Sequence, residues 1–378
     1  MNKLKMRMGV ALIAIVALGV TAAVAGASRH GSADGVARAK AEVMKYQGLP
    51  GWTAPGAALD GKAIAKGKTI MLIPYSTQIP YNAAFNQAAT KYAKKVGFSV
   101  IDYPTAGLPD QWRRGIQLGI SKKVAAISLT AGLDVRALQP QIKQARAAGI
   151  AVLDSTFADP SYPRLPYMSG GVPLDYKQAG VLEANYAIWK TNGKGVFLEI
   201  DTPGLLPSDF VSAGQHEAIK ANCPGCKLYT ISVPIPQWAT NTTPQVIAQL
   251  KAHPEINYIL PHYDSQSSFV IPALLQLGRT DVGIASFNGT PAILELVRAG
   301  KVTMDVSQNV DWTGAATIDA ILRVLGKVAP SSGSINEHIP LRVFDKSNVS
   351  ELKGKITYNS GYGTVAEDNY LKLWGVKK

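Results

Sequence analysis

The chain has 378 residues, which exceeds the size at which one hydrophobic core normally stops growing, so two domains are expected. Hydrophobic residues make up 47% and charged residues 17% of the chain, which excludes a disordered protein. The formal net charge is +13, but lysines and arginines are dispersed along the chain, in pairs at most, which argues against nucleic-acid binding.

Residues 1–27 have the pattern of a secretory signal peptide. Lys3, Lys5 and Arg7 precede an uncharged run, and the small residues up to Ala27 offer a cleavage site. The alternative is an uncleaved membrane anchor, because the run is long enough to span a bilayer. We therefore expect an exported protein, periplasmic or otherwise extracytoplasmic, with tethering through an uncleaved signal as the alternative.

Residues 28–66 are rich in alanine, glycine and proline and are expected to form an N-terminal extension with one short helix near Val36 to Tyr46. Regular structure then begins. A first series of strands is expected at "TIMLIPY", "FSVIDY", "AAISLT" and "IAVLDS". The helices between them include one that stops at Gly97, one from Asp110 and one over Val135 to Ala148.

A second series begins with a helix at Tyr176 to Trp189. Its strands are expected at "GVFLEI", "KLYTISV", "INYIL", "VGIAS", "VTMDVS" and "IPLRVF". Its later helices are expected at Val246 to Leu250, Phe269 to Leu277 and Ala315 to Leu325. So regular an alternation predicts an α/β fold of parallel sheets flanked by helices, in two similar lobes. The C-terminal tail is expected to pack on the outside of a lobe through Tyr370, Leu371, Leu373 and Trp374.

Cys223 and Cys226 are the only cysteines. A redox-active pair needs its first cysteine at a helix N-terminus, whereas this pair follows a predicted helix and precedes a strand. A disulfide that fixes this turn is the favoured interpretation for an exported chain. Two sulfurs without further ligands do not suffice for a zinc site.

Motifs for catalysis are absent from the sequence. There is no phosphate-binding loop, no dinucleotide fingerprint, no G-x-S-x-G and no H-E-x-x-H. "HYD" at His262 to Asp264 places one histidine and one carboxylate together, which is too little for a metal or acid–base site. We therefore expect a protein that is not an enzyme and that carries no cofactor and no metal.

Polar and aromatic residues follow the predicted strands. They stand in "PYSTQIPYN", "DSTF", "PIPQW", "PHYD", "SFNGT" and "SQNVDW". Each segment alone is typical of a turn or a helix cap. Because ligands of open α/β sheets bind at the carboxyl ends of the strands, together they predict a pocket for a small polar ligand with apolar faces.

At these residues the sequence resembles the type I periplasmic solute-binding proteins of ABC importers, in the ribose- and sugar-binding group. The likeness covers Gly67 to Phe344 and is most specific in "HPEINYILPHYD" and "GRTDVGIASFNGTPAILELVRAGKVTMDVSQ". The resemblance implies two Rossmann-like lobes joined by a three-crossover hinge, with crossovers near Ser169, Gln308 and Arg342. Lobe 1 would comprise residues 67–169 with 308–341, and lobe 2 residues 170–307 with 342–378.

The resemblance also implies the ligand-binding residues, with Gln308 at the hinge. They are Ser76, Tyr81, Asn82, Thr156 and Phe157 from lobe 1, and Asp209, Trp238, Tyr263 and Asn288 from lobe 2. Thr156 and Phe157 stand where the family's sugar binders usually have Asp-Arg. Because burying an unpaired charge is costly, a pocket with few charges favours a neutral ligand. A sugar or sugar-like molecule is expected, with a nucleoside-like or aromatic solute as the alternative.

The implied function is capture of this ligand between the lobes and its delivery to the membrane permease of an ABC transporter. We expect a monomer that contacts the membrane through the permease and does not bind nucleic acid. A ligand-sensing receptor of the same fold is the second hypothesis. The LacI-type repressors share the fold, but the signal segment stands here in place of their DNA-binding helices.

Overall fold

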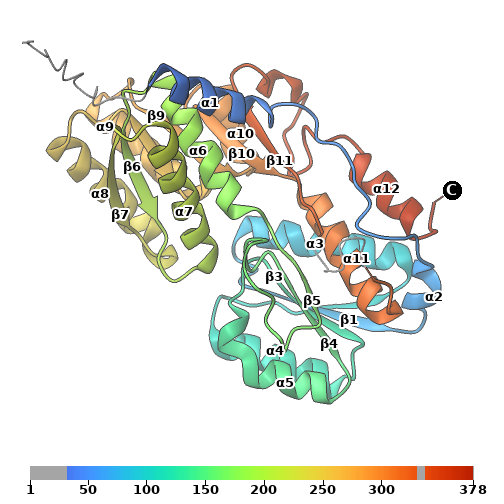
Figure 1. Ribbon diagram of the computed structural model, residues 1–378. Helices are drawn as coiled ribbons and strands as arrows, with labels where there is room; N and C mark the ends of the chain where they lie inside the picture. Colours follow the sequence, from blue (N-terminus) through green and yellow to red (C-terminus); the bar gives the residue numbers. More distant parts are fainter. Residues whose placement is uncertain (1–31, 330–336, 378) are drawn as a thin grey trace, which may run out of the picture.

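The structure, a computed structural model, describes residues 32–329 and 337–377 and consists of two α/β lobes (Figure 1). The predicted signal segment, residues 1–27, lies outside the described residues. Within the described part of the chain, none of the helices combines the length and the apolar character that crossing a membrane requires.

Lobe 1 contains a parallel sheet in the order β2-β1-β3-β4-β5. Its strands are β1 (Thr69–Pro74), β2 (Ser99–Asp102), β3 (Ala126–Thr130), β4 (Ala151–Ser155) and β5 (Gly170–Val172). One face is covered by α3 (Pro80–Val96) and α11 (Val310–Gly326), the other by α4 (Pro109–Ser121), η1 (Val135–Leu138) and α5 (Gln139–Ala147). The predicted stop of α3 is confirmed, since Gly97 closes the helix with a φ of 103° that favours glycine.

Lobe 2 contains six strands in the order β11-β10-β9-β8-β6-β7. They are β6 (Val196–Asp201), β7 (Lys227–Ser232), β8 (Tyr258–Pro261), β9 (Gly283–Asn288), β10 (Met304–Gln308) and β11 (Leu341–Asp345). One face packs against α6 (Tyr176–Lys190) and α7 (Leu206–Asn222), the other against η2 (Ile235–Gln237), α8 (Trp238–Ala252), α9 (Asp264–Leu277) and α10 (Pro291–Arg298). The prediction of wholly parallel sheets is wrong at β11, which pairs antiparallel with β10.

The chain passes between the lobes after β5, after β10 and again after α11. β5 pairs with β4, so residues 170–172 belong to the sheet of lobe 1 rather than to lobe 2 as we expected. α6 then packs in lobe 2, α11 returns to lobe 1, and β11 joins the sheet of lobe 2. Gln308 is the last residue of β10, immediately before the second of these passages.

The two ends of the chain each contact both lobes. In the N-terminal extension, α1 (Ala33–Met44) packs on α6 and α7 of lobe 2, whereas α2 (Gly61–Ala65) packs on α3 and α11 of lobe 1. The C-terminal tail passes through η3 (Val349–Glu351) and ends in α12 (Val365–Leu373), which packs on α11. The tail does pack on a lobe, with Trp374 fully buried, but α12 lies on lobe 1 and not on lobe 2 as we assigned it.

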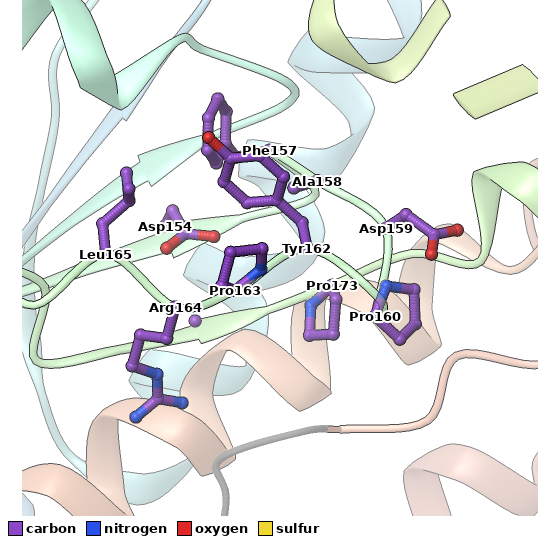
Figure 2. A pocket seen from close by; sticks show the side chains of 11 residues that line it. Asp154, Phe157, Ala158, Asp159, Pro160, Tyr162, Pro163, Arg164, Leu165 and Pro173 are labelled. Carbon is purple, nitrogen blue, oxygen red and sulfur yellow. The ribbon is translucent and has the colours of Figure 1, made fainter. Parts of the chain in front are cut away.

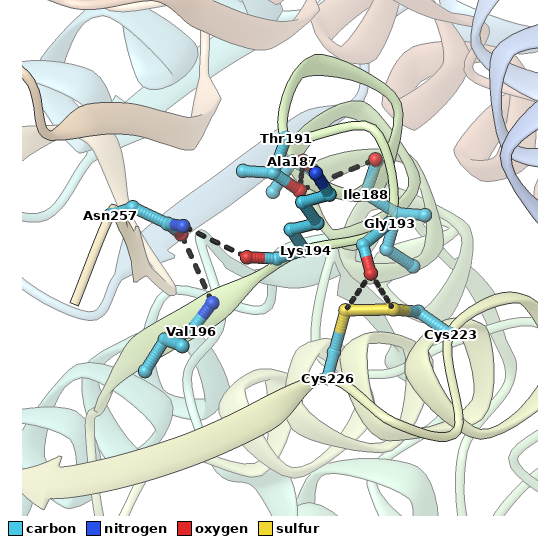
Figure 3. Close-up of a disulfide and its surroundings, with 9 residues drawn as sticks. All are labelled: Ala187, Ile188, Thr191, Gly193, Lys194, Val196, Cys223, Cys226 and Asn257. Atoms are coloured by element: carbon cyan, nitrogen blue, oxygen red, sulfur yellow. Dashed lines mark hydrogen bonds between the residues drawn. A yellow bond between two sulfur atoms is a disulfide. The ribbon is translucent and has the colours of Figure 1, made fainter. Parts of the chain in front are cut away.

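Cys223 and Cys226 form a disulfide between the end of α7 and the start of β7 (Figure 3). Both sulfur atoms lie against the carbonyl oxygen of Gly193, at 3.3 and 3.8 Å. The disulfide therefore fixes an α-to-β turn and touches the turn before β6, and Cys223 stands at the C-terminal end of α7 rather than at the N-terminus of a helix.

Candidate ligand-binding site

A cavity lies between the lobes, at the carboxyl ends of their strands. The empty space between its walls is about 610 Å³ when the open mouth is included. Its walls come from both lobes and from the start of α6. They comprise Tyr75, Ile79, Tyr81, Asn82, Ala131, Gly132, Thr156, Tyr176, Leu205, Pro207, Ile235, Trp238, Tyr263, Ser265, Asn288 and Gln308.

The structure brings seven of the ten predicted site residues together around this cavity. They are Tyr81, Asn82 and Thr156 from lobe 1, and Trp238, Tyr263, Asn288 and Gln308 from lobe 2. Each stands at, or just after, the carboxyl end of a strand or at the start of the following helix. The strand-end rule therefore located seven of the sixteen residues that line the cavity.

Ser76, Phe157 and Asp209 do not line the cavity. Ser76 is buried in its loop, where its Oγ accepts a hydrogen bond from the Gln78 backbone N–H. Phe157 turns into the core of lobe 1, where its ring centroid lies 5.8 Å from that of Tyr162. Asp209 is exposed on the first turn of α7, one residue beyond the buried Ser208, because successive helix residues point about 100° apart.

Phe157 instead lines a separate pocket inside lobe 1, together with Asp154, Tyr162 and Arg164 (Figure 2). Burial raises the pKa of the Asp154 carboxyl to about 7, against the opposing effect of the Arg164 charge. The neighbouring Gly171 leaves room for this carboxylate, since a Cβ there would lie 2.7 Å from Asp154 Oδ2. Asp154 and Phe157 therefore belong to the packing of the lobe rather than to the interlobe cavity.

Sequence reasoning missed nine of the lining residues. They are Tyr75, Ile79, Ala131, Gly132, Tyr176, Leu205, Pro207, Ile235 and Ser265. Tyr75 and Ile79 stood in a stretch already singled out, and Ala131 directly follows a predicted strand. Tyr176 follows no strand end of a lobe, because it begins α6 after the first passage between lobes, so the strand-end rule could not find it.

The backbone around the cavity adopts unusual conformations. Six non-glycine residues among those described have positive φ, and Ala131 (62°), Thr156 (60°) and Asn288 (151°) line the cavity. At Gly289 (75°) any Cβ would lie 2.0 Å from Ser307 Oγ. The Asn288-Gly289 step thus lets β9 run close to β10 and turn abruptly, and strain of this kind collects at functional sites.

Several polar atoms of the cavity wall have no partner within the described chain. The buried hydroxyls of Tyr81 and Thr156 make no hydrogen bond, and neither does Gln308 Oε1. Gln308 Nε2 donates to Asn288 Oδ1 at 3.1 Å, which holds these two carboxamides together. Because buried polar groups are normally paired, the unpaired atoms mark positions where a ligand can supply hydrogen bonds.

No charged side chain lines the cavity among the described residues. A buried carboxylate, that of Asp264, stands between the lining residues Tyr263 and Ser265 in the sequence. It accepts hydrogen bonds from the backbone N–H (2.6 Å) and the hydroxyl (2.8 Å) of Thr290. Burial raises the pKa of Asp264 to about 6, although these bonds lower it. Burial also raises the pKa of the Tyr81 hydroxyl, so this group is a neutral hydrogen-bonding group.

His262, in the "HYD" segment, is fully buried just after the end of β8, an inner strand of the lobe 2 sheet. Its Nε2 lies 2.9 Å from Glu199 Oε1, and its Nδ1 lies 3.6 Å from Asp201 Oδ1. Burial alone would raise the pKa of Glu199, but His262, Ser212 and Thr230 lower it to about 2. No cluster of three or more metal-ligating side chains exists among the described residues.

The lobes contact each other across the mouth of the cavity. Leu206, at the start of α7, joins the apolar core of lobe 1. The ring of Phe210, on the same helix, lies 6.1 Å from that of Tyr162. The two lobes are therefore in contact, and both form the cavity wall.

Comparison with known proteins matches this architecture. A family model for the periplasmic binding protein domain matches residues 70–327. The ribose import binding protein RbsB of Salmonella typhimurium is 24% identical over 292 residues, covering 75% of this chain and 93% of that protein. RbsB of Escherichia coli is 23% identical over 288 residues, with the same coverage.

Two solved structures share the fold. One is an ABC transporter solute-binding protein from Agrobacterium vitis with bound allitol, with a TM-score of 0.66 and 22% identity, covering 77% of this chain and all of that one. Another, from Bacillus halodurans with bound myo-inositol, has a TM-score of 0.66 and 19% identity, covering 77% and 99%. With most of the folded chain matched by the family model and two lobes enclosing one cavity, this chain belongs to the periplasmic binding protein domain family.

Proposed function

We propose that this protein is an exported solute-binding protein, which captures a small uncharged molecule between its lobes and delivers it to the permease of an ABC transporter. The observation that supports this most strongly is the cavity itself. It is walled by both lobes, contains no charged side chain and leaves buried polar atoms unpaired. A neutral ligand with several hydrogen-bonding groups satisfies those atoms without a buried, unpaired charge.

The relatives suggest the class of ligand. RbsB is named for ribose import, and the structural neighbours hold allitol and myo-inositol. Uncharged hydroxylated molecules can supply the hydrogen bonds that the buried polar atoms of the wall lack. A sugar or sugar-like molecule is therefore the proposed ligand.

The proposed mechanism is a shift between open and closed arrangements of the lobes. Tyr81 and Asn82 would hold the ligand from lobe 1, and Trp238 and Asn288 from lobe 2. Contacts from both lobes exist only in the closed form, so the ligand favours that form. Moving such an equilibrium almost completely requires about 5.5 kcal/mol of differential binding. The permease recognises the closed monomer, and no covalent bond of the ligand is broken.

Thermal unfolding in the presence of candidate solutes tests this proposal. We expect one group among neutral sugars, cyclitols, nucleosides and small aromatic compounds to raise the midpoint, since a ligand at 100 times its Kd adds about 2.7 kcal/mol. The variant Gln308→Leu removes the buried carboxamide and should lose the shift. Gln117→Leu, an exposed glutamine on α4, is the matched control and should keep it. A shift that persists in Gln308→Leu, or no shift with any compound, would refute solute capture in this cavity.

A further inference from the structure

Aromatic side chains line the cavity from both lobes and from the start of α6. Tyr75 and Tyr81 come from lobe 1, Trp238 and Tyr263 from lobe 2, and Tyr176 from the start of α6. The rings of Trp238 and Tyr263 lie 6.0 Å apart with their planes tilted by 36°, so they form one continuous wall. Aromatic faces on both sides of a cavity suit a flat ring between them.

The polar groups of these aromatic residues are mostly engaged by the protein. Trp238 Nε1 donates to the Val233 carbonyl at 3.0 Å, and the Tyr176 hydroxyl donates to the Thr156 carbonyl at 2.7 Å. The Tyr263 hydroxyl accepts a hydrogen bond from the Ser208 hydroxyl at 3.3 Å. The protein thus engages the polar ends of these three residues and fixes their rings in the cavity wall.

Few hydrogen-bonding groups are left for the ligand. They include the hydroxyls of Tyr75, Tyr81 and Thr156, Gln308 Oε1, the Asn82 carboxamide and the Asn288 amide nitrogen, and the Ser265 hydroxyl can still accept a hydrogen bond. A hexose or hexitol carries hydroxyls around its whole rim, and each hydroxyl left unpaired in the closed cavity is costly. A planar ring instead buries apolar surface against the aromatic walls, and this burial is favourable.

We propose that the ligand contains a neutral aromatic or heteroaromatic ring attached to a sugar. This inference rests on the proposed function and deepens it. The ring packs between the aromatic walls of the two lobes. A few polar substituents of the ligand pair with the carboxamides and hydroxyls of the wall.

Matched pairs of compounds test the ring directly. Titration calorimetry would compare ribose with inosine, and glucose with phenyl β-D-glucoside, each pair differing by a ring. We expect the ring-bearing member of at least one pair to bind more tightly by about tenfold or more. Trp238→Leu should weaken that member's binding by about tenfold and so reduce the difference in affinity between the two members of the pair.

The outcomes separate this inference from the function on which it rests. Binding of ribose, glucose or a cyclitol that equals or exceeds binding of every ring-bearing compound would overturn the inference and leave solute capture standing. Absence of binding by all compounds would overturn both.

A second inference rests on the two ends of the chain. We define the N-terminal strap as residues 33–65, which precede the region matched by the family model, and the C-terminal tail as residues 346–377, which follow it. Both RbsB relatives and the solved structures are covered over 93–100% of their own length while matching 75–77% of this chain. Strap and tail are thus additions to the shared fold.

The strap is fixed to lobe 2 at its start. Gly35 lets α1 approach α7 closely, because a Cβ there would lie 2.1 Å from the Asn222 carbonyl oxygen. Arg38 Nε donates to Asn222 Oδ1 at 3.1 Å. The strap then runs beside β11, where the Val343 backbone N–H donates to the Tyr46 carbonyl at 2.8 Å.

The strap is fixed to lobe 1 at its end. The ring of Trp52 lies 4.4 Å from that of Tyr370 and 5.7 Å from that of Trp312. Farther along, the backbone N–H groups of Leu59 and Gly61 donate to carbonyls at the end of α12, at 2.9 and 3.0 Å. Figure 1 shows this segment running from lobe 2 to lobe 1 beside the passages between lobes.

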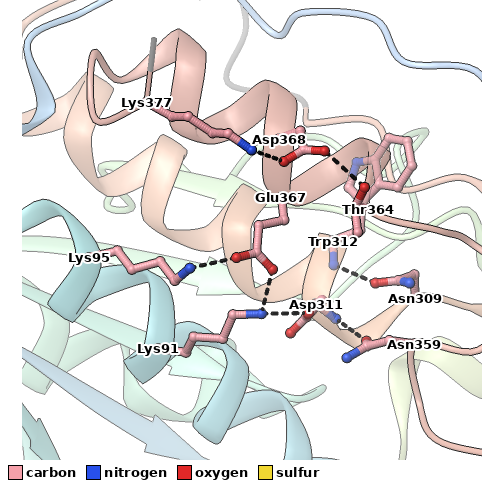
Figure 4. A network of polar contacts seen from close by, with 10 residues as sticks. All are labelled: Lys91, Lys95, Asn309, Asp311, Trp312, Asn359, Thr364, Glu367, Asp368 and Lys377. Atoms are coloured by element: carbon pink, nitrogen blue, oxygen red, sulfur yellow. Dashed lines mark hydrogen bonds and ion pairs between the residues drawn. The ribbon is translucent and has the colours of Figure 1, made fainter.

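The tail makes the same passage. In lobe 2 the Tyr362 hydroxyl donates to the Ser307 carbonyl at 2.7 Å. In lobe 1, Glu367 pairs with Lys91 and Lys95 of α3, and Lys91 also pairs with Asp311 of α11 (Figure 4). Any rotation of the lobes relative to each other must therefore deform the strap and the tail as well as the three passages of the chain between the lobes.

We infer that strap and tail restrict how far the lobes open. Trp52→Ala releases the strap from lobe 1 and should enlarge the radius of gyration of the ligand-free protein, measured by small-angle X-ray scattering. Trp52→Phe keeps an aromatic ring at that position and should behave as the unchanged protein. If Trp52→Ala proves unfolded by circular dichroism, Arg38→Ala, which releases the exposed contact on lobe 2, replaces it. A radius of gyration equal to that of the unchanged protein in a folded release variant would overturn the inference.

Discussion

A buried arginine connects the strap, α11 and the C-terminal tail, and its removal gives a quantitative test of how the ends of the chain are held. Arg323 is 1% exposed and pairs with Asp319 one turn earlier on α11. Its guanidinium also donates twice to the Ala57 carbonyl of the strap, both at 3.2 Å. Asp319 in turn accepts a hydrogen bond from Trp374 Nε1 at 2.7 Å.

A second carboxyl group shares this site. Glu337 is buried and accepts a hydrogen bond from the Tyr370 hydroxyl at 2.9 Å. Burial and the charge of Asp319 raise the pKa of Glu337 well above its usual value, against the opposing effect of Arg323. Without the arginine, two acidic groups would face each other in the core with no cation.

Arg323→Met keeps an unbranched side chain and removes the charge. Removing one partner of a buried ion pair typically costs about 3–5 kcal/mol, because the other charge is left uncompensated. At roughly 2 °C per kcal/mol for a protein of this size, the unfolding midpoint should fall by roughly 6–10 °C. Differential scanning calorimetry measures this directly.

The matched control is Arg114→Met, since Arg114 is exposed on α4. A surface change of this kind should alter stability by less than about 0.5 kcal/mol. The double variant Asp319→Asn with Arg323→Met should recover part of the loss, because the uncompensated carboxylate is then gone. If Arg323→Met were as stable as the control, the reasoning that this pair holds the strap and the tail on α11 would be refuted.

Three further predictions concern pH, the disulfide and the contact between lobes. Burial raises the pKa of Asp154 to about 7 and that of Asp264 to about 6, so the folded protein favours the protonated form of each carboxyl group. This contribution to stability is present in acid and is lost as the pH rises through these values. The unfolding midpoint should fall between pH 5 and pH 8, and less so in Asp154→Asn; an equally steep fall in that variant would contradict the assignment. Replacing Cys223 and Cys226 by serine should lower the free energy of unfolding in urea by about 2 kcal/mol or less, because the loop they close is short. A much larger loss would mean that the disulfide does more than fix the turn. Leu206→Ala should lower ligand affinity by about tenfold in calorimetry through loss of an apolar interlobe contact, and unchanged affinity would contradict a closed binding form.

Most of the lobe architecture could be predicted from periodicity in the sequence. Apolar runs such as that of β1 are buried on both faces and alternate with helices, which is how parallel α/β sheets are built. The antiparallel direction of β11 was not predictable in this way. "IPLRVF" reads as a buried strand in either direction, and only the connection from α11 across the lobes fixes its orientation.

Residues of the cavity wall were predictable where they stand at strand ends. They were unpredictable where the local backbone conformation decides which side chain faces the cavity. Thr156 and Phe157 are neighbours in the sequence. The positive φ at Thr156 leaves Thr156 in the cavity wall and directs Phe157 into the core of lobe 1. Asp209 points away because of its position on a helix turn. Tyr176 enters through the passage between lobes, and no pattern in the sequence marks it.

The ends of the chain were the least predictable part. The residues of the strap are rich in alanine, glycine and proline, and their hydrogen bonds go to partners hundreds of residues away, such as Val343 and Leu373. Such contacts leave no periodic signal in the sequence. Only the apolar residues near the end of the tail, Tyr370, Leu371, Leu373 and Trp374, indicated that this end packs on a lobe.

The measurement that tests the central claim most directly is a calorimetric titration of the protein with the solute that raises its unfolding midpoint, followed by recovery of that solute. We expect one binding site per chain, loss of binding in Gln308→Leu, unchanged binding in Gln117→Leu, and a solute recovered chemically intact. A stoichiometry other than one, binding that survives Gln308→Leu, or a solute returned chemically altered would contradict reversible capture of an uncharged molecule between the two lobes.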